Sequence, residues 1–188
     1  QERDFMHTCD IGFESIKMTL QQKKRADRVI LNGSIKGCAK SGRMLAIMGP
    51  SGSGKTTLVH ALAGRIKANK RLNLSGRRYV NDALLDGDSV IPSAFIEQEA
   101  NFFPHMTVKE TLDFRVELKL GKKLGKAARD DVVADLMDAL GLTKSANTPV
   151  GNSKVRGVSG GERKRLSIAC EMISSPSVIF LDEPTSGL

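Results

Sequence analysis

One stretch decides the fold of this chain: Gly49-Pro50-Ser51-Gly52-Ser53-Gly54-Lys55-Thr56. Its spacing, G-x-x-x-x-G-K-[ST], is that of a phosphate-binding loop. Glycine adopts backbone angles that side chains forbid, so successive N–H groups can turn towards phosphate oxygens. The lysine supplies positive charge to the β- and γ-phosphates, and the threonine hydroxyl is a ligand for Mg²⁺. The stretch therefore predicts a site for a nucleoside triphosphate.

The residues on either side of this loop favour the same interpretation. Residues 42–48 form a short, nearly continuous apolar run, which predicts a strand buried on both faces. Residues 56–64 place apolar side chains at helical intervals and predict a helix whose positive dipole end faces the anion. The alternative is a Gly/Ser-rich turn without function. Such a turn would not need a buried strand before it and a helix after it.

The N-terminal part of the chain predicts a small β layer. Residues 11–20 and 29–35 are strand candidates separated by a polar, basic stretch, and two antiparallel strands there would lie beside a parallel core and carry the nucleotide base. After the first helix, residues 65–92 predict a basic turn, one or two short strands around 72–80, and a loop.

A helical region follows a further predicted strand, residues 93–98. This strand ends on Gln98, and strand ends are where open α/β sheets place ligand chemistry; an exposed loop amide is the alternative. Thr107 and Glu110 form a capping box that opens a helix, and a second helix is predicted over 126–140 with Gly141 as its stop. The apolar residues assigned to these two helices are Val108, Leu112, Phe114, Val116 and Leu118, then Val132, Val133, Leu136, Met137 and Leu140. Two consecutive helices without a strand between them indicate a helical subdomain inserted in the core.

Two polar patterns close the chain, after a loop-like stretch at 143–157. Ser159, Gly160 and Gly161 open another helix, and such a turn is either a second anion-binding device or a simple N-cap. The apolar strand 178–181 then ends in Asp182 and Glu183. Beside a phosphate loop, Asp182 is expected to hold Mg²⁺ and Glu183 to accept the proton of the attacking water; two exposed acids on a surface turn are the alternative.

Composition restricts the possible partners. Lys and Arg number 29 and Asp and Glu number 21, which gives a net charge of +8. The basic clusters at 23–25, 67–71, 119–129 and 163–165 lack interleaved aromatic residues, so we expect solvated faces, with an anionic lipid surface as the alternative. Three distant cysteines indicate a reducing compartment and predict neither a disulfide framework nor a zinc site. The sequence shows no secretion signal and no apolar run near the roughly 20 residues of a spanning helix.

These motifs, in this order, resemble the nucleotide-binding domain of ATP-binding cassette transporters. The stretches 46–51, 107–112, 155–165 and 182–188 look like those of the G subfamily, the white, multidrug and sterol half-transporters. The resemblance covers nearly the whole chain. It implies an α/β fold with a RecA-like P-loop NTPase core, an antiparallel β subdomain and an inserted α-helical subdomain. It also implies one cassette domain over 1–188, with 1–98 and 170–188 as the core and 99–169 as the helical part.

The resemblance also implies roles for individual residues. ATP would be held by Gly49, Pro50, Ser51, Gly52, Ser53, Gly54, Lys55, Thr56 and Thr57. Mg²⁺ would be bound by Thr56, Gln98 and Asp182, and the catalytic residues would be Glu183, Lys55 and Gln98. The signature residues Ser159, Gly160, Gly161 and Glu162 would close over ATP on the opposite subunit, and Ser186 to Leu188 would begin a loop that crosses the dimer.

The implied function is hydrolysis of ATP coupled to export of a lipid, sterol or xenobiotic. The expected cofactors are ATP and Mg²⁺, and the expected partners are a second nucleotide-binding domain, identical or different, and the transmembrane domain of the same full-length chain. No nucleic-acid partner is expected, and the location would be the cytoplasmic face of a membrane. One alternative is a soluble cassette ATPase acting on ribosomes or nucleic acid. Another is a regulatory module that does not hydrolyse ATP, against which Glu183 argues.

Two departures from the family pattern limit these expectations. The family places a switch histidine beyond the acids, whereas His7, His60 and His105 all precede them. The family often stacks adenine on an aromatic residue ahead of the phosphate loop, and residues 23–31 contain none. We therefore expect a fragment, cut shortly after the acids, that alone hydrolyses ATP slowly or not at all.

Overall fold

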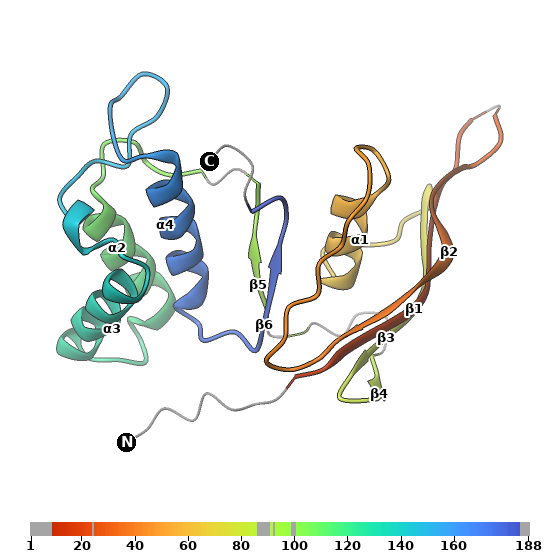
Figure 1. Ribbon diagram of the computed structural model, residues 1–188, viewed down its shortest axis with the longest axis horizontal. Helices are drawn as coiled ribbons and strands as arrows, with labels where there is room; N and C mark the ends of the chain where they lie inside the picture. Colours follow the sequence, from red (N-terminus) through yellow and green to blue (C-terminus); the bar gives the residue numbers. More distant parts are fainter. Residues whose placement is uncertain (1–8, 24, 86–90, 92, 99–100, 185–188) are drawn as a thin grey trace. The chain divides into compact units, whose positions relative to one another are not determined.

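A computed structural model describes residues 9–23, 25–85, 91, 93–98 and 101–184. The chain forms two compact units, Gln1–Ser93 and Ala94–Leu188 (Figure 1). The first unit contains an antiparallel sheet and one helix, and the second contains a group of helices and a two-stranded sheet. The structure is thus mixed α/β, as predicted. No helix of the described residues has both the length and the apolar character needed to cross a bilayer.

The sheet of the first unit confirms the predicted β layer. Its order is β2-β1-β3-β4, and each neighbouring pair is antiparallel. The strands are β1 (Ile11–Leu20), β2 (Arg28–Ala39), β3 (Leu72–Val80) and β4 (Ala83–Leu84). In β1 the buried residues change parity, from Ile11 and Phe13 to Ile16 and Met18. The change coincides with an irregularity in pairing at Ser15, whose φ is 54°, and it explains why the sequence alternates only in part.

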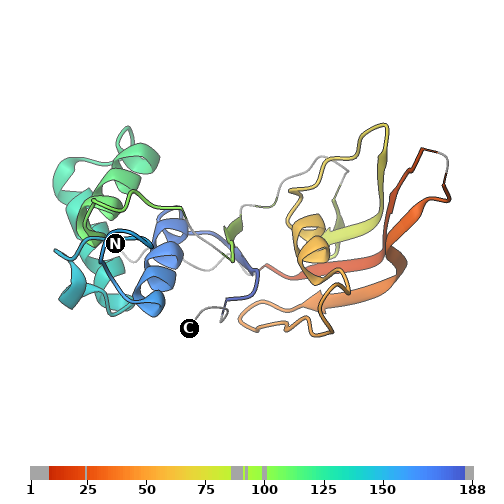
Figure 2. The same ribbon diagram turned by 90° about the horizontal axis from the view of Figure 1, so that it is seen from above.

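The predicted helix after the phosphate loop is present as α1 (Lys55–Leu62). It lies against one face of the β1–β2–β3 sheet (Figure 2) and buries Leu58, Val59, Ala61 and Leu62. At its C-terminal end, Arg78 Nη1 on β3 donates to the carbonyl of Leu62 over 3.2 Å. Burial lowers the pKa of Arg78 from its ordinary value, but the guanidinium stays charged and supports the negative end of the helix.

The predicted strand at 42–48 is wrong. These residues are neither strand nor helix, and the side chains of Met44 and Met48 are 88% and 89% exposed rather than buried on both faces. A strand exists only where a neighbour satisfies its backbone N–H and C=O groups. In the described part of the chain, none of the strands pairs with this run. The apolar character of residues 42–48 indicated burial, but it does not determine whether another strand pairs with them.

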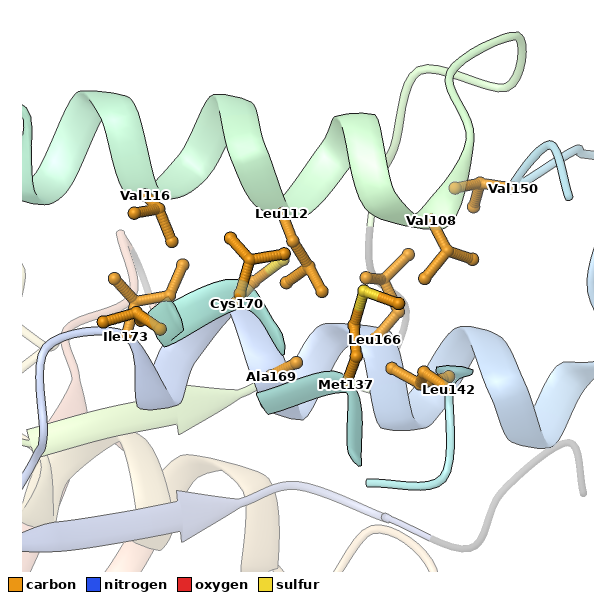
Figure 3. Packing of buried hydrophobic residues seen from close by; sticks show 12 residues of the cluster. Val108, Leu112, Val116, Met137, Leu142, Val150, Leu166, Ala169, Cys170 and Ile173 are labelled. Atoms are coloured by element: carbon orange, nitrogen blue, oxygen red, sulfur yellow. The ribbon is translucent and has the colours of Figure 1, made fainter. Parts of the chain in front are cut away.

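The second unit contains the predicted helices and the two strands that flank them. The helices are α2 (Val108–Leu120), α3 (Lys126–Ala139), the 3₁₀-helix η1 (Thr143–Ser145) and α4 (Gly160–Met172). β5 (Ser93–Ile96) and β6 (Val178–Leu181) form a two-stranded sheet. Side chains from α2, α3 and α4 meet in one apolar cluster, in which Leu112, Leu142 and Leu166 are fully buried (Figure 3).

Three of the five apolar residues that the sequence analysis assigned to α2 belong to this cluster, and two do not. Val108, Leu112 and Val116 are at most 1% exposed, whereas Phe114 and Leu118 are 45% and 68% exposed. The buried three follow a spacing of four residues, which keeps them on one face of a helix. Phe114 and Leu118 are two residues out of that phase and therefore lie on another face of the helix.

Replacing Thr107 by alanine should lower the unfolding free energy of the second unit by about 1 kcal/mol. Thr107 is the N-cap of α2: its side chain accepts from Glu110 N over 3.2 Å, and Glu110 accepts from Thr107 N over 2.8 Å. Alanine removes the acceptor and leaves an N–H of the first turn without its partner. Urea unfolding followed by circular dichroism measures the loss. Thr107→Ser is the control because it keeps the oxygen, and an equal loss in both variants would contradict a capping role.

Candidate functional site

The phosphate loop turns sharply into the N-terminus of α1. Gly52 and Gly54 have φ values of 78° and 92°, in the left-handed region that disfavours side chains. Gly54 is the N-cap of α1 and, as a glycine, has no side chain with which to cap the first turn. A Cβ at Gly54 would lie 3.1 Å from Leu31 Cδ2 on β2. The left-handed backbone angle therefore favours glycine at this position, and a Cβ would also require Leu31 to shift by a few tenths of an ångström.

The side chain of Lys55 folds back over the loop. Its ammonium donates to the carbonyls of Gly49 over 2.9 Å and Pro50 over 3.0 Å. These neutral acceptors are weaker partners for an ammonium group than an anionic oxygen would be. Lys55 thus lies at the mouth of a glycine-lined helix N-terminus, a set of donors that fits a phosphate group. Thr56, in the first turn, is exposed.

The second set of predicted residues lies where β5 and β6 end. The two strands run side by side in the same direction (Figures 1 and 3), and Asp182 N donates to the carbonyl of Ile96 over 3.0 Å. The structure thereby brings the polar ends of both strands, Gln98 and Asp182 with Glu183, to one edge. Asp182 is only 8% exposed, whereas Glu183 is exposed and has a φ of 44°. A partly enclosed carboxylate beside an exposed one suits a metal ligand next to a group that meets water.

Helix α4 is tied directly to this edge. Lys164 Nζ donates to the carbonyls of Glu97 over 2.8 Å and Gln98 over 3.1 Å. A displacement of the first turns of α4 would therefore act on the backbone of Gln98. Lys164 belongs to the basic cluster at 163–165, for which we expected a solvated face; its contact with Gln98 was missed because the two residues lie 66 positions apart along the chain.

The turn at 159–162 is a complete capping box. Glu162 Oε2 accepts from Ser159 N over 2.8 Å and from Ser159 Oγ over 2.7 Å, and Glu162 N donates to Ser159 Oγ over 3.3 Å. The other carboxylate oxygen accepts from Ser145 Oγ. The N-cap interpretation of Ser159 is therefore confirmed, and binding of an anion by the same turn stays a prediction. Ser145 was missed because no sequence pattern links a residue of the preceding loop to this carboxylate.

These contacts, first that from Ser145 and then those from Ser159, lower the pKa of Glu162 from 4.5 to about 2. Because the pKa is lowered in the folded state, the stabilisation is complete above about pH 4.5 and is lost as the pH falls towards 2. We expect the unfolding free energy of Glu162→Gln to depend less on pH than that of the wild type in this range. Urea unfolding at stepped pH values measures the difference, and equal slopes would contradict it.

The predicted residues are divided between the two units. The phosphate loop with Thr56 and Thr57 belongs to the first, and Gln98, the 159–162 turn and both acids belong to the second. The predicted dimer-crossing loop, Ser186 to Leu188, and His7 lie outside the described residues. Among the residues that are described, no group of three or more His, Cys, Asp or Glu side chains forms a ready metal site. Cys9, Cys38 and Cys170 are free thiols.

Comparison with known proteins agrees with the motifs. Residues 33–186 match the family described as ABC transporter. The chain is 48% identical to ABC transporter G family member 7 of Arabidopsis thaliana over 185 residues, 98% of this chain and 25% of that protein. It is 42% identical to ABC transporter G family member 25 of the same plant, over 89% of this chain and 25% of that protein. It is 44% identical to ABC transporter G family member STR2 of Medicago truncatula, over 96% of this chain and 25% of that protein. The chain thus spans about a quarter of the length of these relatives.

Proposed function

Because the chain belongs to the ABC transporter family, we propose that it is the nucleotide-binding domain of a G-subfamily transporter that couples ATP hydrolysis to export across a membrane. Domains of this family bind ATP, usually with Mg²⁺. The observation that carries the proposal is the phosphate loop, where Lys55 lies over the left-handed glycines at the N-terminus of α1. The exported substrate would be a lipid, a sterol or a xenobiotic, as for the half-transporters that the chain resembles.

The proposed roles of the site residues follow from their chemistry. Backbone N–H groups from Gly49 to Thr57, with the ammonium of Lys55, would hold the phosphates of ATP. Thr56, Gln98 and Asp182 would hold Mg²⁺, which supplies positive charge against the phosphate oxygens. Glu183 is the exposed carboxylate at the strand edge and would accept the proton of water; Lys55 and Gln98 would position and stabilise the reacting groups.

The signature turn would act on the ATP of a second domain. Gly160 and Gly161 begin α4, and their N–H groups lie at the positive end of the helix dipole. Both oxygens of Glu162 are engaged in hydrogen bonds, so its proposed contribution is to shape this turn. In this proposal the two units together form a single cassette domain. The domain pairs with a second nucleotide-binding domain, identical or different, and with a transmembrane domain of the same full-length chain. It would lie on the cytoplasmic face of a membrane.

Light scattering of Glu183→Gln tests the proposal. Removing the base while keeping the size of the side chain should trap ATP between two chains, so Mg²⁺-ATP should double the mass and Mg²⁺-ADP should not. Glu171→Gln, a change of the same kind on α4, is the matched control and should dimerise with Mg²⁺-ATP no more strongly than the wild type. A Glu183→Gln variant that binds ATP and stays monomeric would contradict the two-chain site. Salt-sensitive RNA binding would favour the soluble alternative instead.

A further inference from the structure

Two helices of the second unit begin with the same capping box, Thr107 with Glu110 and Ser159 with Glu162. In both, one carboxylate oxygen accepts from the N-cap N–H over 2.8 Å and from the N-cap hydroxyl, over 3.0 Å in the first box and 2.7 Å in the second. The boxes differ at the other oxygen. Of the two capping-box carboxylates, as far as the structure describes the chain, that of Glu162 alone accepts a hydrogen bond from a further side chain, the hydroxyl of Ser145.

Ser145 is held firmly by its own surroundings. It ends the 3₁₀-helix η1 and is 8% exposed. Its N–H donates to the carbonyl of Leu142 over 3.0 Å, and its carbonyl accepts from Thr148 N over 2.9 Å. Leu142 is fully buried in the apolar cluster. The hydroxyl therefore reaches Glu162 from a fixed backbone, and the contact is not a chance meeting of mobile surface side chains.

The orientation of Ser159 depends on this contact. A serine hydroxyl has one proton, and Ser159 Oγ donates it to Glu162 Oε2 while accepting from Glu162 N. A carboxylate anchored by both oxygens cannot rotate away from the N-cap. We propose that Ser145 is a positioning residue for the turn Ser159–Gly161, acting through the carboxylate of Glu162; its effect on ATP rests on the function proposed above.

The electrostatics of the two boxes agree with this inference. Hydrogen bonds to the cap lower the pKa of both Glu110 and Glu162, but for Glu162 the contact with Ser145 is the largest cause and the pKa falls to about 2. The charged neighbour that contributes is Arg165, one turn along α4. The Thr107 box is thus an internal reference that has the same cap without the third donor.

Carbon-13 NMR titration of the glutamate carboxyl groups in the nucleotide-free chain is the direct test. Ser145→Ala should raise the pKa of Glu162 by about one unit and leave that of Glu110 unchanged. Ser145→Thr should restore the wild-type titration because it returns the hydroxyl. If the alanine variant does not fold, Ser145→Cys keeps the size with a weaker donor and should give part of the same shift. A pKa of Glu162 that is the same in the wild type and in the folded variants would overturn the proposal.

ATP-driven dimerisation separates this inference from the proposed function. In the Glu183→Gln background, Ser145→Ala should weaken the dimer about tenfold, and Ser145→Thr should restore it to within about twofold. Thr107→Ala loses a cap of the same kind elsewhere and should leave dimerisation unchanged. Unchanged dimerisation in Ser145→Ala would overturn the positioning role. If Glu183→Gln alone does not dimerise, the two-chain function fails, and the NMR result still decides whether Ser145 holds Glu162.

Discussion

Replacing Lys55 by alanine should weaken ATP binding about 100-fold, which corresponds to the loss of one or two charge-assisted hydrogen bonds. The ammonium already lies over the loop, where the carbonyls of Gly49 and Pro50 hold it 2.9 and 3.0 Å away. It therefore needs little reorganisation to meet a phosphate group that enters the turn. Gly52 and Gly54 reach their left-handed angles without steric cost because they lack a Cβ, so we expect the loop to keep its form in the variant.

Titration of a fluorescent ATP analogue against the wild type and Lys55→Ala measures this effect. Lys67→Ala is the matched control because Lys67 is an exposed lysine of the same unit outside the loop. It removes the same charge and should change the affinity less than about twofold. Equal losses in both variants would mean that the general positive charge of the chain attracts ATP, and the specific role of Lys55 would be refuted. Unfolding curves of both variants show whether the fold is intact.

The sequence predicted the local features of this chain well. The capping box of α2, the N-cap at Ser159, the helix after the phosphate loop and the stop at Gly141 were predicted and are present. Each of them is determined by residues within about one helical turn, where side chains and backbone groups contact one another directly. The loop glycines are equally local, since their backbone angles do not depend on distant contacts.

Features that depend on distant residues were missed or wrong. Among the residues that the structure describes, no strand pairs with the apolar run at 42–48, and the change of parity in β1 at Ser15 follows from how the strand pairs with β2. Ser145 reaches Glu162 across 17 residues, and Lys164 reaches Gln98 across 66. For the candidate site, the assignment of the chemistry to the motif residues stays a prediction. The motifs did not predict the groups that hold those residues in place, because polar residues at any spacing can meet in three dimensions.

Replacing Gly157 by alanine should destabilise the second unit by about 3 kcal/mol. Gly157 crosses the backbone of 149–151, and Val158 N donates to the carbonyl of Pro149 over 3.0 Å. A Cβ at Gly157 would lie 2.4 Å from Val150 O, 2.5 Å from Gly151 N and 2.5 Å from Pro149 O. All three are backbone atoms, which cannot turn aside as the end of a flexible side chain can.

The two segments would have to separate to admit the methyl group, and other contacts would be lost with them. Arg163 of α4 donates to the carbonyls of Val150 and Gly151, so the start of the signature helix would be released as well. Urea unfolding followed by circular dichroism gives the loss. Gly125→Ala is the control, since a Cβ there meets nothing within 4 Å; Gly125 is the N-cap of α3, so the loss should stay at or below about 1 kcal/mol. Comparable stability in the two variants would show that the crossing at Gly157 is looser than its backbone distances indicate.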